Sequence, residues 1–122
     1  MLVSALTHNP QPMHLDHQVA AQSEFGKPLV NSIYTFGLMV GVSVSDTTLG
    51  TLVANLGYDK LVMPRPVFIG DTMRATSEVI ALKESQSRPT AGIVTFQHEL
   101  INQRDEVVCR CTRAALLHRR AA

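Results

Sequence analysis

The sequence lacks most of the features that mark a secreted or nucleic-acid-binding protein. It has two cysteines and no tryptophan, and aromatic residues make up 5% of its 122 positions. Because a disulfide framework requires more cysteines, a small disulfide-stapled fold is excluded. Lys and Arg number 11 against 10 Asp and Glu. The chain therefore lacks the positive balance typical of nucleic-acid-binding domains, and we expect no nucleic-acid partner.

The sequence also lacks a long hydrophobic run. Its longest apolar stretch, residues 33–44, is interrupted by glycine, serine and threonine and falls short of the roughly 20 residues that a membrane helix needs. The N-terminus has no basic start, and its apolar residues stop at Leu6, which does not fit a signal peptide. We expect a cytoplasmic protein without a membrane partner.

The two cysteines, Cys109 and Cys111, are two positions apart. On a strand their side chains would lie on the same side, which is a poor geometry for a disulfide. No further ligand is spaced to complete a metal site, so we expect buried, reduced thiols and no metal. A basic cluster near the C-terminus has a simple interpretation as a solvated edge strand and tail; its members are Arg110, Arg113, Arg119 and Arg120.

The length of 122 residues fits one domain, with a helical first part and a β-rich second part. Asp16 is a candidate N-cap for a short helix over residues 17–25. Asn31 or Ser32 is a candidate N-cap for a second helix over residues 32–45. Because this second helix is apolar on nearly all sides, it is predicted to be buried.

After Gly50 the hydrophobic period changes to that of strands. Strands are predicted over residues 51–62, with a bulge at Gly57, and over residues 72–82, 90–101 and 106–117. Asp71 is expected to cap the turn at Gly70. The short links between strands imply an antiparallel sheet. We therefore predict an α+β fold in which an antiparallel sheet wraps around one long central helix.

The segment 7–16 is polar and holds two prolines and two histidines. Pro10 and Pro12 fix backbone angles, so we expect a stiff loop that presents His14. Histidine exchanges protons near neutral pH, which makes His14 a candidate acid–base group. From the residues alone, a structural or solvated His14 is the alternative.

The run Asn9-Pro10-Gln11-Pro12-Met13-His14-Leu15-Asp16 resembles the hydratase motif of the MaoC and (R)-specific enoyl-CoA hydratase family. Residues 25–32 resemble the stretch that leads into the central helix of its hotdog fold, and residues 66–72 resemble the turn into the next strand. The resemblance implies a single hotdog domain over residues 1–122, and an enoyl-CoA hydratase with no cofactor besides the CoA of its substrate. It also implies that the Ser32 amide polarises the thioester carbonyl, where a helix N-terminus stabilises the developing charge.

The motif departs from the family pattern, because Asn9 stands at the position of a catalytic aspartate and Gln11 at that of an asparagine. An amide is not a general base. His14 would then be the main acid–base group and Asn9 would position water, with His8 as a candidate second titrating group.

Residues 8–16, 28–32, 46–50 and 87–89 are similar to those of the mesaconyl-CoA (β-methylmalyl-CoA) hydratases, which implies a C5-dicarboxylyl-CoA substrate. Its free carboxylate needs a cation, for which Arg65 and Arg88 are candidates. Each arginine could instead bind a CoA phosphate or face solvent. Gln11 and Asn31 complete the predicted substrate-binding set.

The family carries its first hotdog strand ahead of the motif, whereas eight residues precede Asn9 here. We expect that strand to be missing, and an uncovered edge would favour a homodimer or a higher homo-oligomer. Two other functions stay open. One is a non-catalytic acyl-CoA-binding hotdog protein or subunit, which Asn9 supports. The other is a hotdog thioesterase, which would need a carboxylate on or near the central helix; the helix has none before Asp46.

Overall fold

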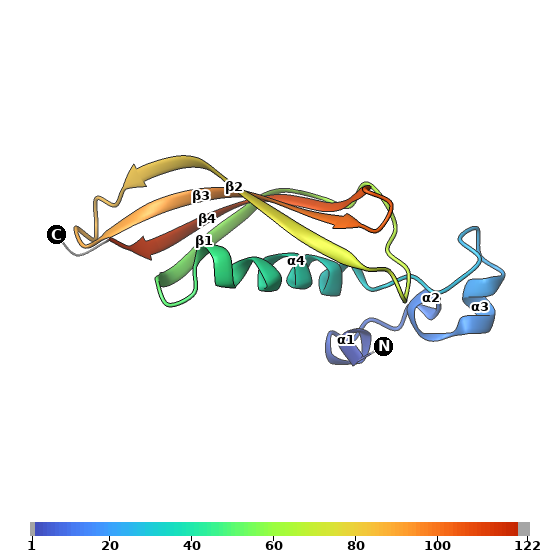
Figure 1. Cartoon of the computed structure of the whole chain (residues 1–122). Helices are drawn as coiled ribbons and strands as arrows, with labels where there is room; N and C mark the ends of the chain where they lie inside the picture. The colour runs from blue at the N-terminus through green and yellow to red at the C-terminus, as the bar shows by residue number, and fades with distance from the viewer. Residues whose placement is uncertain (1, 120–122) are drawn as a thin grey trace.

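The longest helix, α4 (Ser32–Thr47), runs along one face of a four-stranded antiparallel sheet (Figure 1). This computed structural model describes residues 2–119. Asn31 is the N-cap of α4, because its Oδ1 accepts the Ile33 N–H at 2.9 Å. The α+β class, the central helix and one of its two candidate caps are thus confirmed.

The sheet contains β1 (Leu52–Val62), β2 (Met73–Glu84), β3 (Ala91–Asn102) and β4 (Val107–His118). Their order is β1-β4-β3-β2, and every neighbouring pair is antiparallel. Each strand begins and ends within one or two residues of its predicted bounds. A register shift between Asn55 and Gly57 confirms the predicted bulge in β1.

The core lies between α4 and the two inner strands. Residues Thr35, Met39 and Ser43 form the buried stripe of α4, with one residue every fourth position. Met39 belongs to a cluster of buried side chains that also contains Val67, Leu100, Val108, Cys109 and Cys111. Both cysteines are free and buried, as predicted.

The prediction that α4 is buried on all sides was wrong for the single chain. Its outer face exposes Ile33 (54%), Tyr34 (43%) and Val42 (50%) to solvent. A helix that rests on one sheet can cover only one of its faces, whatever the apolar content of the others. An uncovered apolar face of this kind is a common mark of an interaction site.

The interpretation of β4 as a solvated edge strand was also wrong. β4 lies between β1 and β3, and Arg113 is 1% exposed. Its guanidinium donates to Asn55 Oδ1 at 3.2 Å and to Thr47 Oγ1 at 3.5 Å. Because Thr47 ends α4, the negative end of the helix dipole lies close to this buried charge. Arg110 is exposed as expected, and Arg120 lies outside the described residues.

A second buried basic side chain lies beside Arg113. His98 on β3 is 0% exposed, and its Nδ1 lies 2.7 Å from the Ser77 hydroxyl of β2. Burial, and then the charge of Arg113, lower the pKa of His98 from 6.5 to about 4. His98 is therefore a neutral core residue near neutral pH.

Three short helices gather at the N-terminal end of α4 (Figure 1): α1 (Leu2–Leu6), α2 (Pro12–Leu15) and α3 (His17–Ala21). Asp16 caps α3 as predicted, since its Oδ1 accepts the N–H groups of Gln18 and Val19. However, α3 ends four residues earlier than predicted, and the sequence did not indicate α1 or α2. Within residues 2–119 no strand precedes α4, and no helix is long and apolar enough to cross a membrane.

Candidate active site

His14 is held at one end of the molecule by a backbone carbonyl. Its Nδ1 lies 2.8 Å from the carbonyl oxygen of Leu29, and the Leu29 N–H donates to the Met13 oxygen at 3.1 Å. A carbonyl can only accept, so the proton of the neutral ring is on Nδ1 and the lone pair is on Nε2. This tautomer leaves Nε2 as the ring atom that can take up a proton.

His14 forms part of the wall between two cavities. The larger cavity has a volume of about 490 Å³ and the smaller one about 320 Å³. Four residues line both cavities: His14, Leu29, Val30 and Val67. A single imidazole is therefore placed where it can serve a molecule that occupies either or both.

The smaller cavity brings His14 together with Ser32 and Arg65. Ser32 is the first residue of α4, so its N–H has no acceptor within the helix. The N-terminus of this 16-residue helix also favours negative charge. The cavity thus brings an imidazole that can accept a proton together with a helix N-terminus that can donate a hydrogen bond to an anion.

Arg65 supplies a cation to the same cavity. Its Nη1 lies 3.3 Å from Glu106 Oε2, and 60% of the Arg65 side chain is exposed. Hydrogen bonds from Asn102 and Arg104 hold the pKa of Glu106 below its ordinary value, so Glu106 is an anion at neutral pH. An exposed ion pair of this kind is weak, and the guanidinium can still bind a carboxylate in the cavity.

Asn31 lines the larger cavity, but both polar atoms of its side chain already form hydrogen bonds within the chain. While Oδ1 caps α4, Nδ2 donates to the Ser4 hydroxyl of α1 at 3.2 Å. Asn31 and Ser4 are 5% and 1% exposed. Asn31 thus has a structural role at the start of α4, and its contact with a substrate stays a prediction.

The structure does not bring the other predicted polar residues to these cavities. Asn9 Oδ1 accepts the Gln11 N–H at 3.1 Å, so the asparagine shapes a turn, and neither residue lines either cavity. His8 is exposed and has a φ of 58° in the same turn.

Arg88 lies at the opposite end of the sheet from His14. It belongs to the turn that joins β2 to β3 beyond the Glu84–Gly92 pair, whereas Met73, at the other end of β2, lines a His14 cavity. The length of β2 separates the two ends by about 35 Å. The described chain therefore does not place Arg88 and His14 around one substrate.

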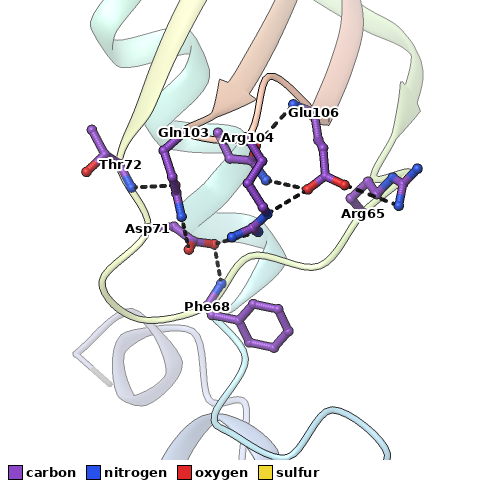
Figure 2. A network of polar contacts seen from close by, with 8 residues as sticks. Arg65, Phe68, Asp71, Thr72, Gln103, Arg104 and Glu106 are labelled. Carbon is purple, nitrogen blue, oxygen red and sulfur yellow. Dashed lines mark hydrogen bonds and ion pairs between the residues drawn. The ribbon is translucent and has the colours of Figure 1, made fainter.

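Figure 2 shows a polar network that the sequence did not indicate. Two of its residues, Phe68 and Asp71, line the larger cavity. The Asp71 side chain, 7% exposed, accepts the Phe68 N–H at 3.0 Å, which confirms the predicted cap of the Gly70 turn. It also accepts from Gln103 Nε2 at 3.0 Å. Burial raises the pKa of Asp71, but these hydrogen bonds and the charges of Arg104 and Lys27 together lower it below its ordinary value.

No group of three or more His, Cys, Asp or Glu side chains within residues 2–119 is arranged to hold a metal ion.

Comparison with known proteins identifies the family. Residues 3–100 match the MaoC like domain. The chain belongs to this family. It is 35% identical over 122 residues to the mesaconyl-CoA hydratase of Cereibacter sphaeroides, a match that covers 95% of this chain and 34% of that protein. It is 34% identical over 92 residues to the (R)-specific enoyl-CoA hydratase of Aeromonas caviae, which covers 75% of this chain and 66% of that protein.

The chain spans only part of several of its relatives. It covers 34% of the Cereibacter mesaconyl-CoA hydratase and 25% of the beta-methylmalyl-CoA dehydratase of Chloroflexus aurantiacus.

Solved structures confirm the predicted hotdog fold. The MaoC-like dehydratase from Rhodospirillum rubrum superimposes with a TM-score of 0.82 at 32% identity, over 98% of this chain and 82% of that one. A Mycobacterium tuberculosis protein with a double hotdog fold has a TM-score of 0.85 at 24% identity, over 96% of this chain and 36% of that one. In the second case the whole of the present fold corresponds to about one of two hotdog units.

Proposed function

We propose that this MaoC-like domain is an enoyl-CoA hydratase, a hydro-lyase that adds water to, or removes it from, the C=C bond next to a thioester. The observation that carries the proposal is that His14 lines the same 320 Å³ cavity as the N-terminus of α4. The similarity to proteins named as hydratases adds support. The reaction needs no cofactor besides the CoA of the substrate.

In the proposed mechanism, His14 Nε2 takes a proton from water as the water oxygen bonds to the β-carbon. The electron pair of the C=C bond moves to the thioester, whose oxygen becomes negatively charged. The free Ser32 N–H stabilises this oxygen, helped by the dipole of α4. The imidazolium then returns the proton to the α-carbon, so that the imidazole is regenerated.

We propose a C5-dicarboxylyl-CoA such as mesaconyl-CoA as the substrate. Arg65 supports this choice, because its exposed guanidinium lines the cavity that also holds His14 and Ser32. A guanidinium binds a carboxylate through two parallel hydrogen bonds. The named activities of two relatives point to the same substrate class.

The larger cavity favours a second candidate, an aliphatic enoyl-CoA. Tyr34, Leu38, Val42 and Met73 line it, and no arginine or lysine does so within the described residues. An apolar chamber of about 490 Å³ suits a hydrocarbon chain better than a free carboxylate.

Turnover of a panel of enoyl-CoA esters, with and without a free carboxylate, tests the proposal by loss of absorbance of the conjugated thioester. We expect hydration, and we expect His14→Ala to lower kcat by about 10²- to 10⁴-fold. His17→Ala is the matched control, since His17 is exposed and lines neither cavity. If His14→Ala turns over at the wild-type rate, the assigned role is wrong. Release of CoA thiol would indicate a thioesterase, and binding without turnover would indicate a non-catalytic subunit.

We further propose that the domain works as a homodimer or larger homo-oligomer in the cytoplasm. The apolar outer face of α4 supports association, and two free, buried thiols fit a reducing compartment. Light scattering coupled to size-exclusion chromatography tests the first point. A monomeric mass at micromolar concentration would contradict it.

A further inference from the structure

The Leu29 carbonyl that holds His14 is itself held from the other side. Leu29 forms an antiparallel bridge with Phe68, and the Val30 N–H donates to the Val67 oxygen at 2.8 Å. The segment at Leu29 therefore lies between α2 and the loop that joins β1 to β2. The position of its carbonyl depends on where that loop is fixed.

Asp71 fixes the loop to the turn between β3 and β4 (Figure 2). One carboxylate oxygen accepts the Phe68 N–H at 3.0 Å, and the other accepts Gln103 Nε2 at 3.0 Å. The Gln103 oxygen in turn accepts the Thr72 N–H at 3.0 Å. The two Gln103 bonds join positions more than thirty residues apart in the chain. Together with the bonds at Phe68, Val30 and Leu29 they form a continuous path from the β3–β4 turn to His14.

The network allows no exchange of donors and acceptors. Asp71 must accept on both oxygens, because the Phe68 N–H and the Gln103 amide both donate to it. An asparagine at this position would turn one acceptor into a donor. Gln103 could flip its amide in response, but its NH₂ group would then face the Thr72 N–H. A carboxylate is therefore specifically required.

We propose that Asp71 is a positioning residue for His14. Through Phe68 and Leu29 it holds the carbonyl that keeps the His14 proton on Nδ1 and leaves Nε2 free as the base. Gln103 completes this link. The proposal deepens the proposed hydratase function, because its kinetic consequence rests on His14 as the acid–base group.

Three variants test the proposal. Asp71→Asn reverses one hydrogen bond, and Gln103→Ala removes the link more gently, in case the first variant folds poorly. Arg74→Gln is the matched control. It breaks an exposed ion pair of 2.9 Å between Arg74 and Asp105 of the same turn, without touching the Phe68 loop. Thermal unfolding of each variant verifies that it is folded.

Nitrogen-15 NMR of the histidine rings gives a readout that does not depend on activity. In the wild type we expect the Nδ1–H tautomer at His14, and in Asp71→Asn and Gln103→Ala we expect a population of the Nε2–H tautomer. The Arg74→Gln spectrum should match the wild type. If the folded Asp71→Asn and Gln103→Ala variants both keep the Nδ1–H tautomer fully, the proposal is overturned.

Kinetics gives the second readout. Asp71→Asn should lower kcat by about 10- to 100-fold with little change in KM, as expected for a misplaced acid–base group. In a His14→Ala background the same substitution should cause no further loss. An equal loss in both backgrounds would contradict the proposal. If the wild type hydrates no substrate, the proposed function fails, while the NMR result still decides whether Asp71 positions His14.

Discussion

The buried histidine on β3 gives this domain a pH-dependent stability that can be calculated. The pKa of His98 falls from its ordinary value of 6.5 to about 4 in the folded chain, chiefly because of burial and secondarily because of the Arg113 charge. Below about pH 6.5 His98 binds a proton in the unfolded chain, whereas in the folded chain it stays neutral until the pH approaches 4. The free energy of unfolding is therefore highest above about pH 6.5 and decreases as the pH falls towards 4. Below about pH 4 the titration of His98 changes it little further.

The magnitude follows from the two pKa values. Between about pH 7.5 and pH 5, the linkage relation gives a loss of about 2 kcal/mol in the free energy of unfolding. The full difference of 2.5 units between 6.5 and about 4 corresponds to about 3 kcal/mol at most. Asp71 and Glu106, whose pKa values are also lowered from 3.8 and 4.5, add their own losses at lower pH. Measurements above pH 5 therefore isolate the histidine.

Urea unfolding followed by circular dichroism at several pH values measures this effect. His98→Gln keeps a polar group near Ser77 and removes the titration, so its stability should vary far less between about pH 7.5 and pH 5. His17→Gln, at an exposed position of α3, should keep the wild-type slope. A wild-type stability that is flat over this range, or an unchanged slope in His98→Gln, would refute the reasoning.

Three further predictions concern other parts of the chain. Asn31→Ala removes the cap of α4 and should lower the free energy of unfolding by about 1–2 kcal/mol, measured by urea titration; Asn31→Asp keeps the cap and should lose less. Arg65→Gln should raise KM about 10-fold or more for a dicarboxylyl-CoA but leave KM for a straight-chain enoyl-CoA unchanged, and equal effects on both esters would contradict its carboxylate role. Burial raises the pKa of Cys109 to about 11 and also raises that of Cys111, so both thiols should react with a disulfide reagent far more slowly in the native state than in urea.

The strands were predictable because alternation with a period of two is a strong local signal. The interior position of Arg113 was not, because a single charged residue in a strand gives no sign of its partners. Those partners, Thr47 and Asn55, are 66 and 58 residues away along the chain. The order of the strands decides whether β4 lies at the edge or in the interior of the sheet, and this order cannot be deduced from a single sequence.

The buried face of α4 could not be read from its sequence for a different reason. Its residues are apolar on almost every side, so the hydrophobic period does not favour one face. The sheet in fact covers Thr35 and Ser43. These small side chains let the helix pack closely on the sheet, because their hydroxyl groups can donate hydrogen bonds to carbonyl oxygens of the helix itself. Ser43 Oγ, for example, donates to the Val40 oxygen at 2.6 Å.

The candidate site was only partly predictable. The sequence pointed to His14, Ser32 and Arg65, which the structure places around one cavity. It did not separate Arg65 from Arg88, because both lie in loops beside prolines and only the sheet register distinguishes their ends. The hydrogen bond between Asp71 and Gln103 could not be predicted for the same reason, since a tertiary hydrogen bond produces no periodic pattern in the sequence.

The wall shared by the two cavities has a consequence for how such a domain can change its specificity. Because His14 lines both cavities, their remaining walls can vary without a change at His14. A smaller side chain at Tyr34 or Leu38 would lengthen the apolar chamber without altering the surroundings of Arg65, and a change at Arg65 would leave the apolar chamber intact. For the proposed hydratase, single substitutions of this kind would exchange one acyl group for another while His14 and the N-terminus of α4 stay unchanged.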